Sequence, residues 1–386
     1  MKNYCDVVIV GAGASGLLCG GMLAKEGFSV TIIEKNTRVG KKLSATGNGR
    51  CNYTNLNMSE NCFYGDEKWI KTVLDTCTSE DVIRKFESIG VFHREKDGYV
   101  YPYTNQASTV INALEKLCER YQAEMVMECK VTAIIPDKEN EGYRVRTSDG
   151  EMRCQYVVIA TGGKASPELG GDGSGYKLAR SLGHSIHSVF PALTGLVCEG
   201  DYWKQVAGTR IQGKFSLLLD QKLIEGETGE IQIVKDGVSG IPVFQLCRVA
   251  AKALSEGRQV KGVIDFVPPM EESEIKKWVD EFGVSGLVPQ KWITLVENRA
   301  ELEKVLKSFS FPIVKTFGME RAQVTAGGIP TEEVVNETME SKKAKGVFLI
   351  GEVLDVDGIC GGYNLHFAWA TANLATKEMI RIKKGK

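Results

Sequence analysis

The sequence predicts an α/β protein in which a smaller, β-rich domain is inserted into a dinucleotide-binding domain. Two observations predict this architecture. A strand, a glycine-rich turn, a helix and a second strand follow one another near the N-terminus. From about residue 194 the pattern changes to short alternating strands, and near residue 328 it returns to glycine turns and buried strands. We therefore expect one domain over residues 1–193 and 328–386, and a second over 194–327 with a helical part at about 270–310.

The stretch DVVIVGAGASG ends an apolar strand on a GxGxxG turn, the fingerprint of a Rossmann fold. Gly11 permits the turn, Gly13 lets the backbone approach a pyrophosphate, and Gly16 lets the helix pack closely on the strand. Backbone N–H groups at the start of that helix, at Ala14 and Ser15, are expected to face phosphate oxygens.

The second strand, FSVTIIE, ends on Glu34 and is followed by Lys35. Glu34 lies 23 residues after Gly11, where a carboxylate can bind a ribose 2′-hydroxyl and would repel a 2′-phosphate. The fingerprint alone leaves NAD and FAD open. A strand ending near Thr161 and Gly162, together with the C-terminal stretch VFLIGEVLDVDGICGGYNL, closes a single dinucleotide domain, and this arrangement favours FAD.

Bulk composition is that of an ordinary soluble globular protein, with 43% hydrophobic and 25% charged residues. The net charge of -1 gives no global field that favours nucleic acid or an anionic membrane, so neither partner is expected. Eleven cysteines without a CxxC pair fit reduced thiols, and we predict a cytoplasmic protein. No metal-ligand cluster stands out, and the oligomeric state does not follow from the sequence.

The inserted region contains alternating stretches such as IQGKFSLLLD and KGVIDFVP, which indicate a small β-barrel or sandwich. The later run from PPMEESEIKKWVDEFGV through RAELEKVLKSFSF is charged and helical in pattern, and we expect a three-helix cap there. Earlier, residues 66–120 carry amphipathic helical runs. The first two of these runs, WIKTVLDTC and SEDVIRKFESIG, are followed by Tyr101 and Tyr103, which either line the active site or simply pack.

Several motifs resemble one known family: TGNGRCNYTN, ATGGKASPELGGDGSGY, VTAGGIP, TMESK and GEVLDVDGICGGYNL. They are similar to the HI0933-like bacterial flavoproteins, or aminoacetone oxidase family of FAD-binding proteins, which includes 3-dehydro-bile-acid Δ4,6-reductases. The matches extend from Val7 to about Asn373. The resemblance implies a glutathione-reductase-like FAD-binding domain with an inserted β-barrel-like domain, and FAD as the cofactor of an oxidoreductase.

The same resemblance implies that RVGKKLSATGNGRCN wraps the FAD. Lys42 and Ser44 are expected to approach the pyrophosphate. The isoalloxazine is expected to lie against Gly47, Asn48 and Gly49. Arg50 either binds an anionic group or pairs with a structural carboxylate. Cys51 is expected to be a small packing residue, because no resolving cysteine is suitably spaced.

The C-terminal glycine bend is expected to approach the flavin from the other side, with the positive end of the last helix near flavin N1 and the C2 carbonyl. Asp355 is expected on the ribityl chain or as a helix cap, and the Val131 backbone near the adenine. The further cofactor residues expected in this segment are Gly351, Glu352, Gly362, Asn364 and Leu365.

The cofactor is expected to carry the chemistry, with hydride passing through flavin N5 and a small substrate held between the two domains. Arg50, Tyr363 and His366 are weak candidates for catalytic residues, and the catalytic acid is expected to be Tyr363, His366 or a bound water. His366 stands where the family has glutamine, and an ordinary helix-face histidine is favoured there over a catalytic acid. We predict reduction of a conjugated enone, like that of a 3-oxo bile acid, by NADH or NADPH. The alternatives are oxygen-dependent oxidation of a small amine such as aminoacetone, tRNA modification, and FAD binding without turnover.

Overall fold

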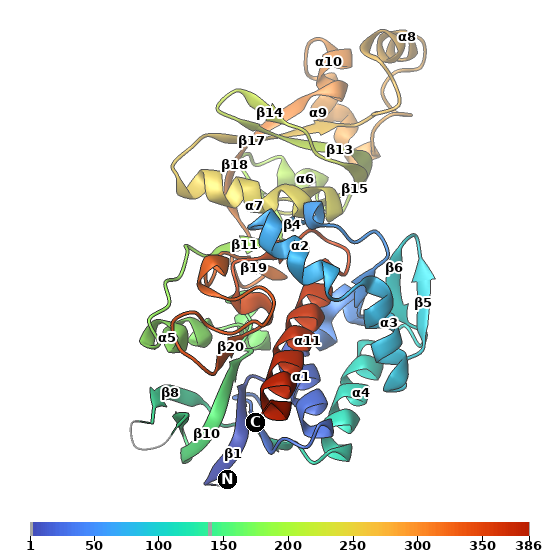
Figure 1. Cartoon of the computed structure of the whole chain (residues 1–386). Helices are drawn as coiled ribbons and strands as arrows, with labels where there is room; N and C mark the ends of the chain where they lie inside the picture. Colours follow the sequence, from blue (N-terminus) through green and yellow to red (C-terminus); the bar gives the residue numbers. More distant parts are fainter. Residues whose placement is uncertain (1–2, 138–140, 386) are drawn as a thin grey trace. The chain divides into compact units, whose positions relative to one another are not determined.

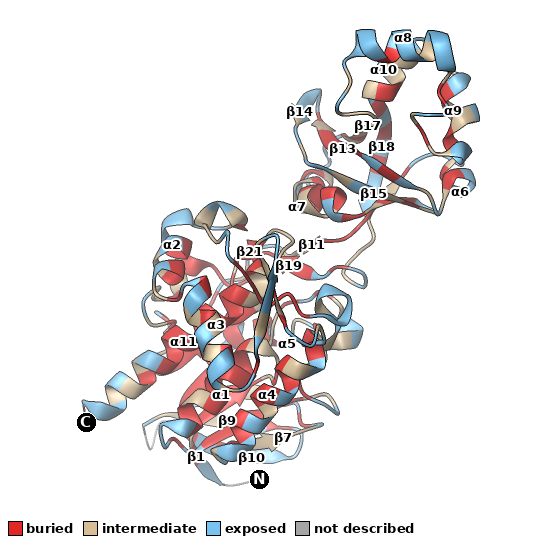
Figure 2. Cartoon of the chain, turned by 90° about the vertical axis from the view of Figure 1, so that its right-hand side faces the viewer, coloured by how far each residue is buried: buried red, intermediate tan, exposed pale blue. Residues whose placement is uncertain are grey.

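The computed structural model describes residues 3–137 and 141–385, which form two compact units (Figure 1). The first unit runs to Val189 and resumes at Val324, and the second is Phe190–Gln323. Both crossings lie four residues before those expected from the sequence. In each unit the buried residues gather in a continuous core (Figure 2).

A seven-stranded sheet organises the first unit. Its central parallel strands contain buried hydrophobic runs, as expected for strands covered on both faces, whereas the parallel strand at the edge is only half-buried. The parallel strands are β1 (Tyr4–Val10), β2 (Val30–Ile33), β7 (Glu124–Val126), β10 (Gly150–Ile159) and β20 (Val347–Leu349). The antiparallel strands β8 (Val131–Pro136) and β9 (Tyr143–Thr147) extend the sheet beyond β10. Strands β9 and β10 form a hairpin, with Gly150 opposite Thr147.

Helices pack against this sheet and against one another. Helix α1 (Ala14–Lys25) follows β1 and packs against α4 (Ala107–Arg120) and the long α11 (Tyr363–Lys384). The expected helices after residue 66 are α2 (Glu67–Asp75) and α3 (Ser79–Ser88). A capping box between Thr78 and Asp81 fixes the start of α3.

Smaller elements complete the first unit. Strands β3 (Thr54–Asn55), β6 (Tyr99–Pro102) and β5 (His93–Lys96) form a three-stranded sheet in that order, and β3 contacts α3. Tyr99 and Tyr101 lie on one face of β6, because side chains alternate along a strand. The remaining elements are β4 (Phe63–Tyr64), α5 (Ser174–Ser181), β19 (Val324–Ala326), β21 (Asp357–Gly358) and the 3-10 segments Leu43–Gly49, Glu60–Cys62, Pro167–Leu169, Thr331–Glu333 and Gly351–Val353.

The second unit contains a closed antiparallel barrel of six strands among its described residues, which settles the barrel-or-sandwich alternative. The sheet closes because β13 pairs with both β15 and β17, so no barrel strand is left as an open edge. The barrel strands are β12 (Leu196–Cys198), β13 (Arg210–Leu219), β15 (Thr228–Val234), β16 (Gly237–Ser239), β17 (Val260–Asp265) and β18 (Phe309–Thr316). Outside it lie β11 (Phe190–Ala192), β14 (Lys222–Ile224), α6 (Trp203–Val206) and the 3-10 turn Gln290–Trp292.

Helices in this unit agree with the sequence in part. The cap expected near 270–310 is present as α8 (Glu272–Phe282), α9 (Ile293–Glu297) and α10 (Leu302–Lys307). The end of that stretch, SFSF, was wrongly expected to be helical: from Phe309 it forms β18, because alternate side chains there are buried in the barrel. Helix α7 (Ile241–Ser255) was not expected, although its buried residues recur at helical spacing.

Candidate active site

The glycines of the first turn occupy three different environments. A Cβ on Gly11 would lie 2.6 Å from the Ala160 carbonyl oxygen, and its φ of +107° also favours glycine. A Cβ on Gly16 would collide with the Gly11 carbonyl. No described atom lies within 4 Å of the position that a Cβ on Gly13 would take. The first and third glycines are therefore required for packing within the chain, whereas the second leaves open space at the N-terminus of α1, beside the backbone of Ala14 and Ser15.

Glu34 organises the end of β2. Its Oε2 accepts from the backbone N–H of Ala12 at 2.8 Å, and its Oε1 accepts from the backbone N–H and side-chain amide of Asn36 at 2.9 and 2.6 Å. The side chain is buried, and a carboxylate has about four acceptor positions. One position is left for a ribose hydroxyl, so Glu34 both braces the turn and can bind the cofactor.

A polar network joins the segment after β2 to the C-terminal part of the chain. Lys42 forms an ion pair with Glu352, with Nζ 2.7 Å from Oε2. The Thr325 N–H donates to the same carboxylate at 2.9 Å, and the Gly351 N–H donates to Thr371 Oγ1 at 3.0 Å. Gly40, two residues before Lys42, donates to the Ala12 carbonyl. The predicted residues Lys42, Gly351 and Glu352 therefore come together beside the glycine turn.

Two buried polar atoms near this network have no hydrogen-bond partner among the described residues. They are Oδ1 of Asp355 and the hydroxyl of Tyr176. The other carboxylate oxygen of Asp355 lies 2.7 Å from His187 Nδ1. Burial, assisted by Glu352 and Asp355, raises the pKa of Tyr176, so its hydroxyl remains a donor. A buried donor and a buried acceptor without partners are what a hydroxyl-rich cofactor chain would satisfy.

Tyr176 is a residue that sequence reasoning missed as a ligand, although it closes the GGDGSGY motif. The turn before it also has room. Gly162 has a φ of +68°, and its Cβ position is free of described atoms within 4 Å. Thr161, beside it, packs so closely on Gly175 that a Cβ there would collide with its hydroxyl. This second glycine turn is therefore shaped from within the chain, like the first.

The TGNGRCN loop adopts a left-handed backbone at three successive residues, with φ of 57° at Gly47, 55° at Asn48 and 81° at Gly49. No described atom lies within 4 Å of a Cβ placed on Gly49. Ser44, two residues before the loop, donates to the Lys41 carbonyl at 2.7 Å. The loop therefore presents bare backbone on one side, as expected for a surface that a flat ring covers.

The C-terminal bend is held rigidly at the start of α11. The side chain of Asn364 both accepts from the Gly358 N–H and donates to the Gly358 carbonyl, each at 2.8 Å. Gly362 has a φ of 91° and is the N-cap of α11. Leu365 is partly buried against the core. Asn364 is therefore occupied in shaping the bend, and it is the backbone N–H groups at the start of α11 that are left for a ligand.

Arg50, in the TGNGRCN loop, lies over the aromatic ring of Tyr101. The guanidinium of Arg50 lies 5.8 Å from the ring centroid of Tyr101, and its Nε donates to the Gly47 carbonyl at 3.1 Å. No carboxylate of the described chain pairs with Arg50, which leaves its terminal nitrogens available. Burial raises the pKa of Tyr101, although nearby Arg50 opposes this effect. Tyr101 is therefore a neutral phenol near pH 7.

The catalytic role considered for His366 is not supported by its surroundings. The side chain is fully buried, Nδ1 lies 2.8 Å from Thr54 Oγ1, and Nε2 lies 2.9 Å from the Cys77 carbonyl. Because a carbonyl only accepts, Nε2 carries the proton and Nδ1 accepts from Thr54. Burial lowers the pKa of His366 to about 4. The ring is therefore a neutral structural link between α11 and neighbouring segments.

Other predicted residues have defined places. Tyr363 is buried, and its hydroxyl donates to the Asn57 carbonyl at 3.5 Å. Cys51 is fully buried, and burial raises the pKa of its thiol to about 12, as a packing cysteine requires. Lys35 forms an ion pair with Asp172 at 2.5 Å. Val131 begins β8, two residues after Cys129, whose N–H donates to the Glu34 carbonyl at 3.0 Å.

The residues present fit FAD. Open space at Gly13, Gly162 and Gly49, the remaining acceptor position of Glu34 and the unpartnered Asp355 oxygen form the cradle that a long dinucleotide needs. The fold and this cluster define a flavoprotein of the Rossmann class.

Comparison with known proteins identifies the particular family. The family model "HI0933-like protein Rossmann domain" matches residues 5–378, and the chain belongs to this family. It is 38% identical to a 3-dehydro-bile acid delta(4,6)-reductase of Clostridium scindens, over 95% of this chain and 97% of that protein. It is 27% identical to a ribosomal RNA dihydrouridine synthase of Haemophilus influenzae, over 99% of this chain and 100% of that protein. The chain is thus an FAD-dependent oxidoreductase.

Solved structures support the fold. A 3-ketosteroid delta1-dehydrogenase from Sterolibacterium denitrificans matches with a TM-score of 0.57 and 11% identity, covering 99% of this chain and 100% of that chain. A 3-ketosteroid-delta4-(5alpha)-dehydrogenase from Rhodococcus jostii matches with a TM-score of 0.54 and 13% identity, covering 97% of each chain. Within residues 3–137 and 141–385, no helix is long and apolar enough to span a bilayer.

Proposed function

We propose that this enzyme reduces a carbon–carbon double bond conjugated to a carbonyl, with electrons that come from NADH or NADPH through FAD. The names of two relatives support this chemistry. One is a delta(4,6)-reductase, and the other makes dihydrouridine, whose parent uracil has a C5=C6 bond conjugated to its C4 carbonyl. The higher identity to the bile acid enzyme favours a 3-oxo bile-acid-like substrate over RNA.

The observation that carries the proposal is the guanidinium of Arg50 above Tyr101, whose terminal nitrogens pair with no described carboxylate, beside the bare loop at Gly49. FAD, when bound, supplies the hydride equivalent at N5. As hydride adds to the double bond, negative charge develops on the carbonyl oxygen. The planar N–H donors of Arg50 are suited to bind that oxygen and stabilise its charge. Tyr101 is protonated at neutral pH and is suited to donate the proton that completes the reduction.

Tyr99 lies against the glycine bend, close to Tyr101 along the chain. A Cβ on Gly361 would lie 3.1 Å from the Tyr99 ring, so the ring packs closely on the bend. Tyr99 and Tyr101 share a face of β6, and together they would cover a flat, apolar substrate.

The direct test is anaerobic stopped-flow spectroscopy of the FAD-loaded protein. NADH or NADPH should bleach the flavin, and a 3-oxo-Δ4 bile acid should restore its absorbance. Rapid bleaching by aminoacetone, with no response to either nucleotide, would establish the amine oxidase instead. Reoxidation by oligouridine but not by the bile acid would transfer the same chemistry to RNA. If none of these reductants bleaches the flavin, the protein binds FAD without turning over any of the substrates tested.

Two variants separate the proposed roles, with Tyr103→Phe as the matched control because Tyr103 is exposed at the end of the same strand. Tyr101→Phe should slow flavin reoxidation by the enone about a hundredfold, within the usual range for a general acid, and leave bleaching by NADH or NADPH unchanged. Arg50→Ala should lower kcat/KM for the enone about a hundredfold at full FAD occupancy. A parallel loss of FAD occupancy and thermal stability in Arg50→Ala would show that Arg50 only braces the loop.

A further inference from the structure

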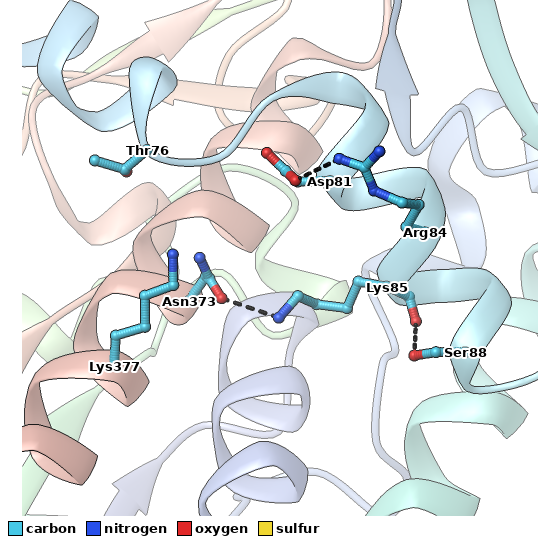
Figure 3. A pocket seen from close by; sticks show the side chains of 7 residues that line it. All are labelled: Thr76, Asp81, Arg84, Lys85, Ser88, Asn373 and Lys377. Carbon is cyan, nitrogen blue, oxygen red and sulfur yellow. Dashed lines mark hydrogen bonds and ion pairs between the residues drawn. The ribbon is translucent and has the colours of Figure 1, made fainter.

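A polar cavity lies on the first unit, between α3 and the C-terminal half of α11. Its volume is about 440 Å³, and it is lined by Thr76, Asp81, Arg84, Lys85, Ser88, Asn373 and Lys377 (Figure 3). Asn373 lies ten residues after Tyr363 along α11, so the cavity is about 15 Å further along that helix than the glycine bend. It is therefore separate from the proposed active site.

The cavity carries excess positive charge. Three cations line it against one carboxylate, and that carboxylate, Asp81, is already bound to Arg84 at 2.8 Å. Lys377 and Lys85 have no carboxylate partner in the part of the chain that the structure describes. Lys85 is half-buried and Lys377 is exposed. A half-buried ammonium such as that of Lys85 is normally compensated by an acid, so the cavity is suited to bind an anion from outside the chain.

Lys85 is held in place by neutral groups. Its ammonium donates to Asn373 Oδ1 at 2.9 Å and contacts the Met22 sulfur at 3.5 Å. Burial is the largest influence on Lys85 and lowers its pKa. Among the weaker influences, Cys77 and Asp81 raise this pKa, and the charges of Lys377 and Lys25 lower it. Holding the Lys85 ammonium here therefore costs desolvation free energy, and a bound anion would offset that cost.

Asn373 adds a neutral donor to the cavity. Its oxygen accepts from Lys85, so the amide nitrogen is the end that is left for a ligand. The residue is 5% exposed, and the nitrogen is accessible at the cavity surface, since it is not one of the buried atoms without a partner. Figure 3 shows the side chains of Asn373, Lys85 and Lys377 converging in the cavity. An amide donor flanked by two ammonium groups matches the tetrahedral oxygens of a phosphate.

We propose that this cavity binds the phosphate group of a small, nucleotide-sized molecule. Its volume lies within the range of about 300 to 1,000 Å³ that is usual for small-molecule sites and exceeds what one phosphate group requires. The phosphate would accept from Asn373 Nδ2 and from the ammonium groups of Lys85 and Lys377. The rest of the ligand would occupy the remainder of the cavity, whose lining also includes Thr76 and Ser88.

Calorimetric titration of the FAD-loaded protein with inorganic phosphate and with AMP tests this site. Saturating FAD keeps both probes out of the cofactor cradle. Both should bind, and Lys377→Met should weaken each at least fivefold. Lys276→Met, which removes an exposed lysine on α8, should leave both affinities unchanged. Equal effects of phosphate and of chloride at the same ionic strength, or equal weakening by the two variants, would overturn the proposal.

A second readout does not depend on those variants. Lysines methylated with a ¹³C label report their own pKa by NMR, and the pKa of Lys85 should rise when phosphate binds. No change would mean that phosphate does not reach Lys85, and the proposal would fail. Oligouridine provides the other possible source of phosphate. If it binds through Lys377 while inorganic phosphate and AMP do not, the cavity is a contact for an RNA backbone and the small-molecule assignment is wrong.

Discussion

Replacing Gly13 with alanine is the most direct test of where the FAD lies. Gly13 has a φ of -82° and a ψ of -167°, an extended conformation that alanine adopts without strain. The added methyl group would meet no described atom within 4 Å. The variant should therefore fold normally, and its only new contact should be with a ligand at the N-terminus of α1.

The magnitudes separate folding from binding. Without FAD, alanine is a poorer helix N-cap than glycine by up to about 1 kcal/mol. Restricting the unfolded chain offsets about 0.4 to 1 kcal/mol of that loss. In the FAD complex the methyl group would push the pyrophosphate away from backbone N–H groups. Losing one charge-assisted hydrogen bond costs about 1.5 to 3 kcal/mol, or roughly a tenfold to a hundredfold rise in Kd.

The assay is a fluorescence titration of the FAD-free protein with FAD, combined with thermal unfolding of the same samples. Gly16→Ala is the matched control, because its Cβ would collide with the Gly11 carbonyl whether or not FAD is bound. That variant should lose stability without cofactor, by about 1 to 3 kcal/mol for an overpacked site. If Gly13→Ala binds FAD as tightly as the native protein, the pyrophosphate does not pass this turn and the placement is refuted.

Three further predictions concern buried groups. Glu34→Gln should weaken FAD binding by roughly 1.5 to 3 kcal/mol and lower the melting temperature of the FAD-free protein, since two backbone N–H groups lose a charged acceptor; an unchanged melting temperature would contradict its bracing role. The low folded-state pKa of His366 means that its contribution to stability is present above pH 6.5 and is lost as the pH falls toward 4. About 2 kcal/mol should disappear between pH 7 and pH 5, and urea titrations of His366→Gln should show that much less pH dependence while kcat is retained. Alkylation of the native protein, followed by mass spectrometry, should modify Cys62 and Cys360, which are partly exposed, and spare Cys51, whose pKa burial raises to about 12.

Sequence reasoning succeeded where the physical requirement is local. The roles assigned to Gly11 and Gly16 follow from backbone angles and from Cβ collisions, and the structure shows those collisions. The alternation of FSFPIVKT was also visible in the sequence. The charged helical run before it extends the predicted cap to Phe311, so the first three residues of β18 are wrongly assigned to the cap and not to the barrel. Helix α7 carried a clear helical spacing that was not used.

The sequence by itself determined the Rossmann turn, the glycine-rich cradle and the family, because each depends on residues that are neighbours along the chain. The tertiary structure alone decided which polar groups meet. Lys42 pairs with Glu352 across 310 positions, and His366 joins Thr54 across 312. Such partners have no local signature, since the energy of a buried charge or imidazole depends on what the fold places around it. For the same reason, only the folded chain shows that His366 is structural, and that no carboxylate of residues 3–137 and 141–385 holds Arg50.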